Sequence, residues 1–257
     1  MSYFVDTHTH LYSAEFDADR TEMIQRALDA NVQKLLLPNI DLESLAGMYE
    51  LEQQFPKNCH AMLGLHPCSV DENYKTVLDT LYQELQKRKF LAIGEIGIDL
   101  YWDKTFLNEQ KDAFKTQIAW SKAFGIPFVI HARDSFTEIY EVLDEVWDDS
   151  LKGVFHCFTG TLDDVEKINT YKNMYFGIGG VSTFKKSDLP NVIPAIPTER
   201  LLLETDSPYL APTPKRGKRN ESSYIPLIAD NLATILQKSV EEVRDLTTQN
   251  AQNLFNF

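Results

Sequence analysis

The chain has 257 residues, 43% hydrophobic and 11% aromatic, with a formal net charge of −13. This composition is typical of a globular protein long enough for one (β/α) barrel or two smaller domains, and it argues against a protein that coats polyanions. No apolar run reaches 18 residues, no signal-peptide pattern precedes the first strand, and the three cysteines are scattered, so we predict a cytoplasmic protein without a membrane span.

Eight short apolar runs are predicted as strands, and nearly all of them are followed by a helical pattern. The first run starts at Phe4 and leads into His8 and His10, and the others are predicted at 33–38, 60–67, 90–95, 128–131, 153–156, 174–178 and 201–206. Helices are predicted at 18–30, 42–55, 73–89, 106–124, 136–147, 162–171, 224–237 and 240–254. Between the last two strands, a weak helical piece is interrupted by Pro190, Pro194 and Pro197.

The strict alternation of strands and helices implies a parallel sheet with helical crossovers. Eight such units in one chain of this length is the count for a TIM (β/α)8 barrel. We therefore predict an α/β fold in a single domain over residues 1–257, with extra helices at the C-terminal end. A doubly wound open sheet is the alternative architecture.

Histidine and acidic residues recur at the carboxyl ends of the predicted strands. Five of the six histidines lie there, whereas His60 begins its strand. Because the carboxyl ends of barrel strands meet in one ring, where active sites lie, these residues should converge. The residues concerned are His8, His10, His66, Glu95, His131, His156 and Asp206.

Six of these residues are the predicted metal ligands, which is more than one tetrahedral ion needs. The set suits two divalent ions about 3.5–4 Å apart, with Glu95 between them, and Mg, Mn and Zn are all candidates. His8, His10 and Asp206 would hold one ion, and His131 and His156 the other.

Two acids near the ligands are predicted to support them. Asp6 lies two residues before His8 and is expected to orient a ligand, as carboxylates beside metal sites commonly do. Glu204 should lie on the same strand face as Asp206, either as a buried partner of a basic residue or as a site acid.

Other polar residues are candidates for substrate binding. His66 precedes Pro67 and either caps a turn or donates a hydrogen bond to a phosphate. The basic run 215–219 follows a predicted strand end, so Arg216 and Lys218 either lie in solvent or contact substrate.

The chain resembles the TatD family of metal-dependent deoxyribonucleases, within the amidohydrolase-like barrels, over essentially its whole length. The segments that carry the resemblance are Val5-Asp6-Thr7-His8-Thr9-His10-Leu11, Gly64-Leu65-His66-Pro67, Gly94-Glu95-Ile96-Gly97-Ile98-Asp99, His131-Ala132-Arg133-Asp134, His156-Cys157-Phe158-Thr159-Gly160, Glu204-Thr205-Asp206-Ser207-Pro208-Tyr209-Leu210, Arg216-Gly217-Lys218-Arg219-Asn220-Glu221 and Asn250-Ala251-Gln252-Asn253-Leu254-Phe255.

The resemblance implies a distorted TIM barrel, a metal site made of the six ligands, and DNase activity of the 3′→5′ exonuclease type. Single-stranded DNA or frayed ends would be the substrate, and no obligate protein partner is expected. Two positions depart from the family pattern. Ser222 stands where proline is common after Asn-Glu, and Leu100-Tyr101-Trp102 follows Asp99 in place of the usual aromatic pair.

The predicted reaction is phosphodiester hydrolysis by a metal-activated hydroxide. Asp206 would bind metal and accept the proton of the water, Glu95 would join the two ions, and His66, Arg133 and Lys218 would stabilise charge on the phosphoryl oxygens. The alternative enzyme acts on a carbonyl substrate, such as a lactone, a cyclic amide or an aminoacyl-tRNA ester, because fold alone does not decide function. A non-enzymatic metal-binding partner is the third possibility.

Overall fold

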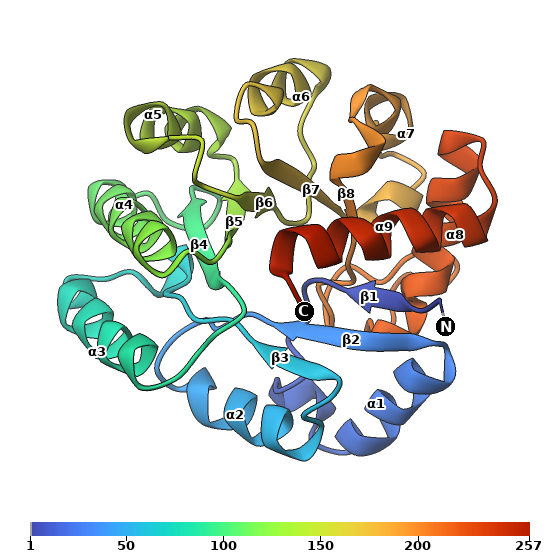
Figure 1. The fold of residues 1–257 in the computed structure, drawn as a ribbon, viewed down its shortest axis with the longest axis horizontal. Coiled ribbons are helices and arrows are strands. Elements are labelled where there is room, and N and C mark those ends of the chain that lie inside the picture. Colours follow the sequence, from blue (N-terminus) through green and yellow to red (C-terminus); the bar gives the residue numbers. More distant parts are fainter. Residues whose placement is uncertain (1) are drawn as a thin grey trace.

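Figure 1 shows the computed structural model of the chain, which describes residues 2–257. The described residues contain eight strands: β1 (Phe4–Asp6), β2 (Val32–Leu37), β3 (Cys59–Ala61), β4 (Ile93–Asp99), β5 (Phe128–Arg133), β6 (Gly153–Phe155), β7 (Met174–Ile178) and β8 (Leu201–Leu203). They also contain nine α-helices: α1 (Arg20–Asp29), α2 (Ser44–Gln54), α3 (Tyr74–Lys87), α4 (Leu107–Phe124), α5 (Phe136–Val146), α6 (Leu162–Asn169), α7 (Leu189–Val192), α8 (Ile225–Leu236) and α9 (Val240–Phe255).

The strands form two parallel sheets, β1-β2-β3 and β4-β5-β6-β7-β8, which together make the inner ring of Figure 1. A few backbone hydrogen bonds join the sheets at both seams. At one seam, Thr7 N–H donates to Leu203 O at 3.0 Å. At the other, Leu63 N–H donates to Ala92 O at 3.1 Å and Gly94 N–H donates to Leu63 O at 2.9 Å. The prediction of an α/β fold with a distorted TIM barrel is confirmed.

Several predicted strand bounds were wrong. β1, β3 and β8 end earlier than predicted, so His8 and His10 follow β1 rather than lie on it. β4 instead continues four residues beyond Glu95, because the segment from Ile96 to Asp99 pairs with β5. Glu95 therefore lies inside a strand, and its polar side chain did not mark the end of that strand.

The barrel interior is filled by its own apolar cluster, separate from the core between strands and outer helices. Strand residues such as Val5, Leu36 and Val129 point inward and pack against α9, which contributes Leu254 and Phe255. Figure 1 shows α9 lying across this end of the barrel. Because this apolar cluster fills the barrel interior on the side of α9, polar side chains can gather only at the opposite end of the barrel.

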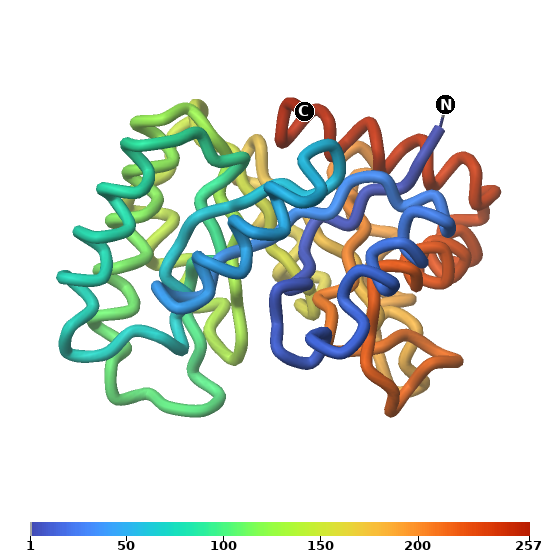
Figure 2. The backbone as a smooth tube through the Cα atoms, turned by 90° about the horizontal axis from the view of Figure 1, so that it is seen from below, coloured from blue at the N-terminus to red at the C-terminus, as the bar shows by residue number. Residues whose placement is uncertain are grey.

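The loops that follow the strands gather at that opposite end. Figure 2 shows the segments near residues 10–20, 100–105 and 210–220 along one edge of the molecule, with both termini and α9 at the other edge. Among the described residues, no helix is long and apolar enough to cross a membrane.

The apolar cluster between the barrel strands and α9 leads to a prediction about stability. Leu254→Ala should lower the free energy of unfolding by about 2–5 kcal/mol, because it opens a cavity where a 2% exposed side chain closes the barrel interior. Asn253→Ala, an exposed position on the same helix, should change it by less than about 0.5 kcal/mol. Urea denaturation followed by circular dichroism measures both, and equal effects would contradict the role given to α9.

Candidate metal centre

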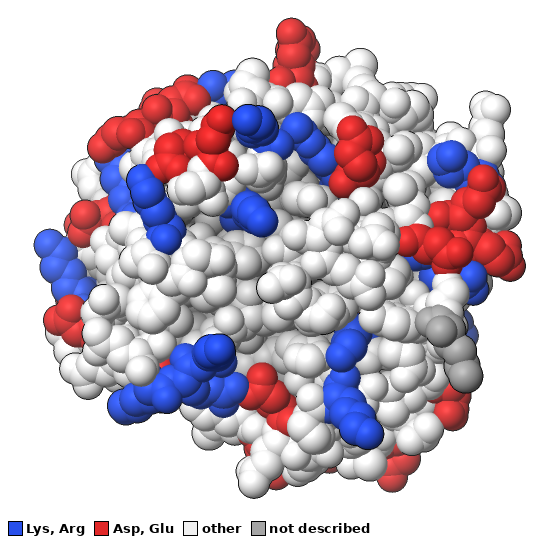
Figure 3. Space-filling model, in the orientation of Figure 1, with Lys and Arg blue, Asp and Glu red and all other residues white. Residues whose placement is uncertain are grey.

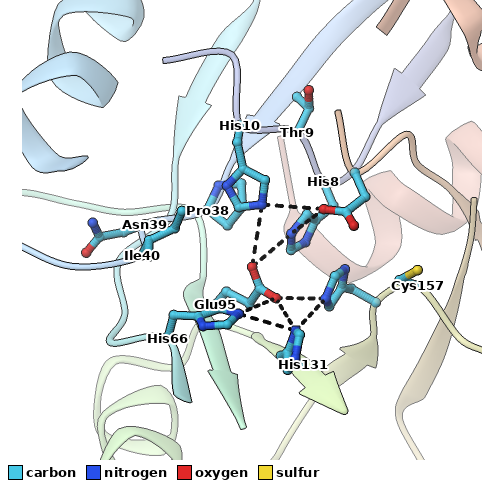
Figure 4. Close-up of polar contacts among 12 residues, drawn as sticks. His8, Thr9, His10, Pro38, Asn39, Ile40, His66, Glu95, His131 and Cys157 are labelled. Carbon is cyan, nitrogen blue, oxygen red and sulfur yellow. Dashed lines mark hydrogen bonds and ion pairs between the residues drawn. The ribbon is translucent and has the colours of Figure 1, made fainter. Parts of the chain in front are cut away.

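The structure brings the predicted strand-end residues together in one cleft of about 670 Å3. His10, His66, Glu95, His131, His156 and Asp206 line it, and His8 is fully buried beside them. Figure 4 shows the side chains of His8, His10, His66 and His131 pointing toward Glu95. His60 stacks on Phe257 in another part of the molecule.

Glu95 is the centre of the cluster, because its two carboxylate oxygens face two different groups of imidazoles. Oε2 lies 3.1 Å from His8 Nε2 and 3.6 Å from His10 Nε2. Oε1 lies 2.8 Å from His131 Nδ1 and 2.8 Å from His156 Nε2. Burial opposes ionisation of this carboxyl, but the surrounding histidines outweigh it and hold the pKa of Glu95 well below its ordinary value.

Asp206 completes the first of these groups. Its Oδ1 lies 3.4 Å from His10 Nε2 and 3.8 Å from His8 Nε2. Its backbone N–H donates to the carbonyl oxygen of His8 at 2.9 Å, so the segments after β1 and β8 are held side by side. Burial opposes ionisation of Asp206 as well, yet the contact with His10 and the nearby imidazoles of His156 and His8 lower its pKa.

Tyr12 sets the tautomer of His10. The Tyr12 hydroxyl donates to Pro38 O at 2.6 Å, so its oxygen accepts the hydrogen bond from His10 Nδ1–H at 2.9 Å. Nε2 of His10 is then left with a lone pair directed toward Glu95. Sequence reasoning missed Tyr12, although its place two residues after His10 continues the spacing of His8 and His10.

Asp99 does the same for His131, through the other ring nitrogen. Nε2–H of His131 donates to Asp99 Oδ2 at 2.8 Å, so in the neutral ring, the form that binds a metal, Nδ1 faces Glu95 with its lone pair. Burial raises the pKa of Asp99, but the hydrogen bond and charge of His131, together with hydrogen bonds from Tyr101 N–H and Cys68, outweigh it and the pKa falls to about 2. Sequence reasoning also missed Asp99, and the signal was its position four residues after Glu95, on the same face of one strand.

His66 differs from the other histidines, because its Nδ1 accepts a hydrogen bond from Cys68 N–H at 3.0 Å. In the neutral ring the proton is therefore on Nε2, which lies 3.3 Å from Glu95 Oε1. His66 thus caps the short helical turn at Pro67–Ser69, as one of the two alternatives predicted, and it lines the cleft. Its donation of a hydrogen bond to a phosphate stays a prediction.

The two predicted supporting acids have different tasks. Glu204 Oε1 lies 3.5 Å from His156 Nδ1 and accepts from the backbone N–H of Cys157, so it lies beside a histidine of the cluster rather than an arginine or lysine. Asp6 accepts from Thr205 N–H at 2.9 Å and from the Thr205 hydroxyl at 2.6 Å. Asp6 thus ties β1 to the segment that carries Asp206, and burial raises its pKa to about 7.

The donor set of the cluster fits a cation. His8, His10 and Glu95 form a group that could hold a metal, and His131 joins Glu95 in another. The carboxylates of Glu95 and Asp206 and the ring nitrogens of the histidines are directed into one small volume, and such mixed oxygen and nitrogen donors are the ligands that divalent cations take. The chemistry of the residues therefore favours divalent metal binding.

Besides His66, three basic residues were predicted to bind substrate, and one of them lies in the cleft. Arg133 lines the cleft. Arg216 and Lys218 are exposed, and the Arg216 guanidinium lies 3.6 Å from the centre of the Phe184 ring. Within the described residues, the Lys218 side chain makes no hydrogen bond or ion pair. Arg219 is used by the fold, since it donates to Asp19 Oδ2 at 2.8 Å.

Comparisons with known proteins agree over the whole chain. The family described as TatD related DNase matches residues 5–256. An uncharacterized metal-dependent hydrolase of Bacillus subtilis, YabD, is 36% identical over 97% of this chain and 98% of its own. A 3′-5′ ssDNA/RNA exonuclease TatD of Pantoea vagans is 33% identical over 97% of this chain and 98% of its own. The crystal structure of a TatD homolog from Escherichia coli K12 superposes with a TM-score of 0.91 at 29% identity, covering 99% of this chain and 98% of that one.

The contact between Asp99 and His131 yields a prediction. Asp99→Asn should weaken the affinity for Mn2+ by about 10- to 100-fold, because His131 loses the charged acceptor that fixes its tautomer. Isothermal titration calorimetry measures the affinity. Asp103→Asn removes a charge from an exposed position in the loop after β4 and should bind Mn2+ like the unaltered protein. Unchanged affinity in Asp99→Asn would contradict the orienting role.

Proposed function

The chain belongs to the family of TatD related DNases, and from this premise we propose that it is a metal-dependent nuclease acting on the ends of single-stranded or frayed DNA. The observation that carries the proposal is the position of Glu95 between two groups of imidazole nitrogens. Such a carboxylate is suited to join two divalent cations, and paired cations are a recurrent device for phosphodiester cleavage.

The geometry supports a division of the ligands into two sets. His8, His10, Asp206 and Oε2 of Glu95 would hold one ion. His131 and Oε1 of Glu95 would hold the other together with His156. Mg, Mn and Zn all remain candidates, since the imidazole-rich sets favour Zn or Mn and the carboxylates also suit Mg. Bound there, two such ions lower the pKa of a water and withdraw charge from phosphoryl oxygens.

The protein's own groups complete the reaction. Asp206 is ionised and its side chain keeps 14% exposure to the cleft, so it can accept the proton of the attacking water. The water oxygen forms a bond to phosphorus, the bond from phosphorus to the sugar oxygen breaks, and the proton taken up by Asp206 passes to the leaving sugar oxygen. His66 Nε2–H donates to a phosphoryl oxygen as negative charge grows there, and Arg133 on the same cleft wall adds positive charge.

The size of the cleft supports a single-stranded substrate. A volume of about 670 Å3 lies within the range of pockets that hold one small ligand. One or two nucleotides can enter such a space, whereas an intact duplex is too wide to bring one of its phosphates near to Glu95, which is 2% exposed. A strand end or a frayed terminus meets this constraint.

The distribution of charge supports binding from the cleft side. On the face seen in Figure 3, which is the side of α9, basic and acidic side chains are interspersed and no broad area is only basic. With a net charge of −13, attraction of a phosphate backbone must come from local groups. Arg133, Arg216 and Lys218 are the proposed local groups on the side of the cleft.

The alternative of a carbonyl substrate is not favoured, because the matched family is described by nuclease activity and the Pantoea relative is named as an exonuclease.

The proposed cell compartment is the cytoplasm. Three free thiols, those of Cys59, Cys68 and Cys157, support a reducing setting of that kind.

The two-ion arrangement predicts a stoichiometry. Protein stripped with EDTA and dialysed against Mn2+ or Zn2+ should bind two ions per chain, because the ligands on the two sides of Glu95 form separate sets. Elemental analysis measures the ratio. Saturation at one ion per chain under every metal would contradict the proposal.

The proposed role of Asp206 predicts loss of nuclease activity. Asp206→Ala should cleave 5′-labelled single-stranded DNA at least about 100-fold more slowly, because a ligand and the proton acceptor are both removed. Gel assays of initial rates measure this. Asp79→Ala, an exposed acid on α3, is the matched control and should cleave at the normal rate. Normal cleavage by Asp206→Ala would show that the reaction takes place elsewhere.

The basic loop yields a prediction about binding. Arg216→Ala combined with Lys218→Ala should weaken binding of single-stranded DNA and flatten the slope of log affinity against log salt by about 1.4, or about 0.7 for each lost phosphate contact. Fluorescence anisotropy across a salt series measures the slope. Lys87→Ala with Lys89→Ala removes the same charge from exposed sites before β4 and should leave the slope unchanged. An unaltered slope in the first variant would mean that the loop only lies in solvent.

A further inference from the structure

One wall of the cleft carries a cluster whose two exposed aromatic rings are not used by the proposed chemistry. Tyr101, Trp102 and Arg133 form it, and we refer to these three residues as the aromatic shelf. Trp102 is 73% exposed and Tyr101 is 53% exposed, although both rings are large and apolar. Because an exposed tryptophan gives up the free energy of burial, its place beside a catalytic cleft points to a ligand.

The shelf is ordered by its own contacts. The Arg133 guanidinium lies 3.8 Å from the centre of the Tyr101 ring and 5.3 Å from that of Trp102. The rings of Tyr101 and Trp102 meet edge to face, with centres 4.7 Å apart. The guanidinium of Arg133 therefore contacts both rings and holds them in place, while most of the Trp102 side chain still faces solvent.

The shelf is also aligned with the metal centre, because Asp99 contacts both. Tyr101 N–H donates to Asp99 Oδ1 at 3.0 Å, while Asp99 Oδ2 accepts from His131. Arg133 lies opposite Asp99 in the pairing of β4 with β5, two residues after His131. Trp102 and Arg133 line the same cleft as Glu95. A phosphate near Glu95 would thus have the shelf next to it along the wall.

We propose that the aromatic shelf stacks an unpaired nucleobase adjacent to the phosphate in the metal centre. The inference rests on the proposed function for its class of substrate, a nucleotide or single strand. Every base has a π face, so stacking on Trp102 accepts any sequence, and Arg133 supplies a cation for the neighbouring phosphate. A base within a duplex is already stacked on its neighbours, so the shelf selects a free or frayed strand end.

Two small ligands isolate the contribution of the base. Thymidine 5′-monophosphate and 2-deoxyribose 5-phosphate carry the same phosphate and sugar, and only the first has a base. Calorimetric titration of the Mn2+-loaded enzyme should give about 5- to 150-fold tighter binding of the nucleotide, the range for stacking one base on an aromatic side chain. Trp102→Ala should reduce this ratio to near one, and Trp102→Phe should keep much of it.

A matched control separates stacking from the loss of any surface aromatic residue. Phe124 is 40% exposed at the end of α4, outside the cleft, and Phe124→Ala should keep the unaltered ratio. If Trp102→Ala keeps the full preference for the nucleotide, the inference is overturned. It is also overturned if the unaltered enzyme binds both ligands equally.

The two measurements, the affinity ratio and the nuclease activity, test the aromatic shelf and the proposed function independently. An enzyme whose Trp102-dependent ratio is present but which leaves every DNA intact would contradict the proposed nuclease function and support the shelf. An enzyme that cleaves single-stranded DNA, with a ratio that does not depend on Trp102, would support the nuclease and overturn the shelf.

Discussion

The whole site depends on one carboxylate, Glu95, held between imidazole nitrogens on both of its oxygens. Three of the contacts to it, from His8, His131 and His156, are 2.8 to 3.1 Å long. Burying a carboxylate and several imidazoles costs free energy unless charge and hydrogen bonds compensate for it. The cluster is therefore a feature that the remainder of the fold must stabilise, and its composition suits a site for cations.

The fold stabilises the cluster by placing apolar side chains at one end of the barrel and polar side chains at the other. One end is filled by inward side chains and sealed by α9, where Leu254 and Phe255 are nearly fully buried. The other end collects the residues that follow the strands. Asp6 and Thr205, which are distant in sequence, hold the first and last strand segments together beneath the site. Rigid placement of Asp206 beside His8 follows from that link.

The net negative charge of the molecule also limits where a nucleic acid can bind. A strongly acidic surface keeps phosphate backbones away from most of the protein, so association is restricted to places with local cations. Arg219 is not one of these, because it pairs with Asp19 and lies over the Phe16 ring. Arg133 serves two purposes, since the guanidinium that faces the cleft also orders the exposed rings of the aromatic shelf.

Much of the site could be predicted from the sequence. Alternating apolar runs and helical patterns indicate a parallel barrel, and the carboxyl ends of barrel strands meet in one ring. Residue type and position therefore sufficed to bring His8, Glu95 and Asp206 to one place, whatever their separation along the chain. Glycine and proline marked many element ends, as at Gly125 after α4, where a left-handed backbone conformation ends the helix.

The strand bounds and the orientation of the rings were decided only by the tertiary structure. β4 continues past Glu95 because its partner β5 offers backbone groups there, and pairing across a sheet is not encoded in the local pattern. Which nitrogen of His10, His66 or His131 carries the proton depends on the atom that contacts the other nitrogen. Tyr12, Cys68 and Asp99 supply those atoms. A sequence specifies which residues can bind, but the direction of a lone pair is set by a neighbour brought close in three dimensions.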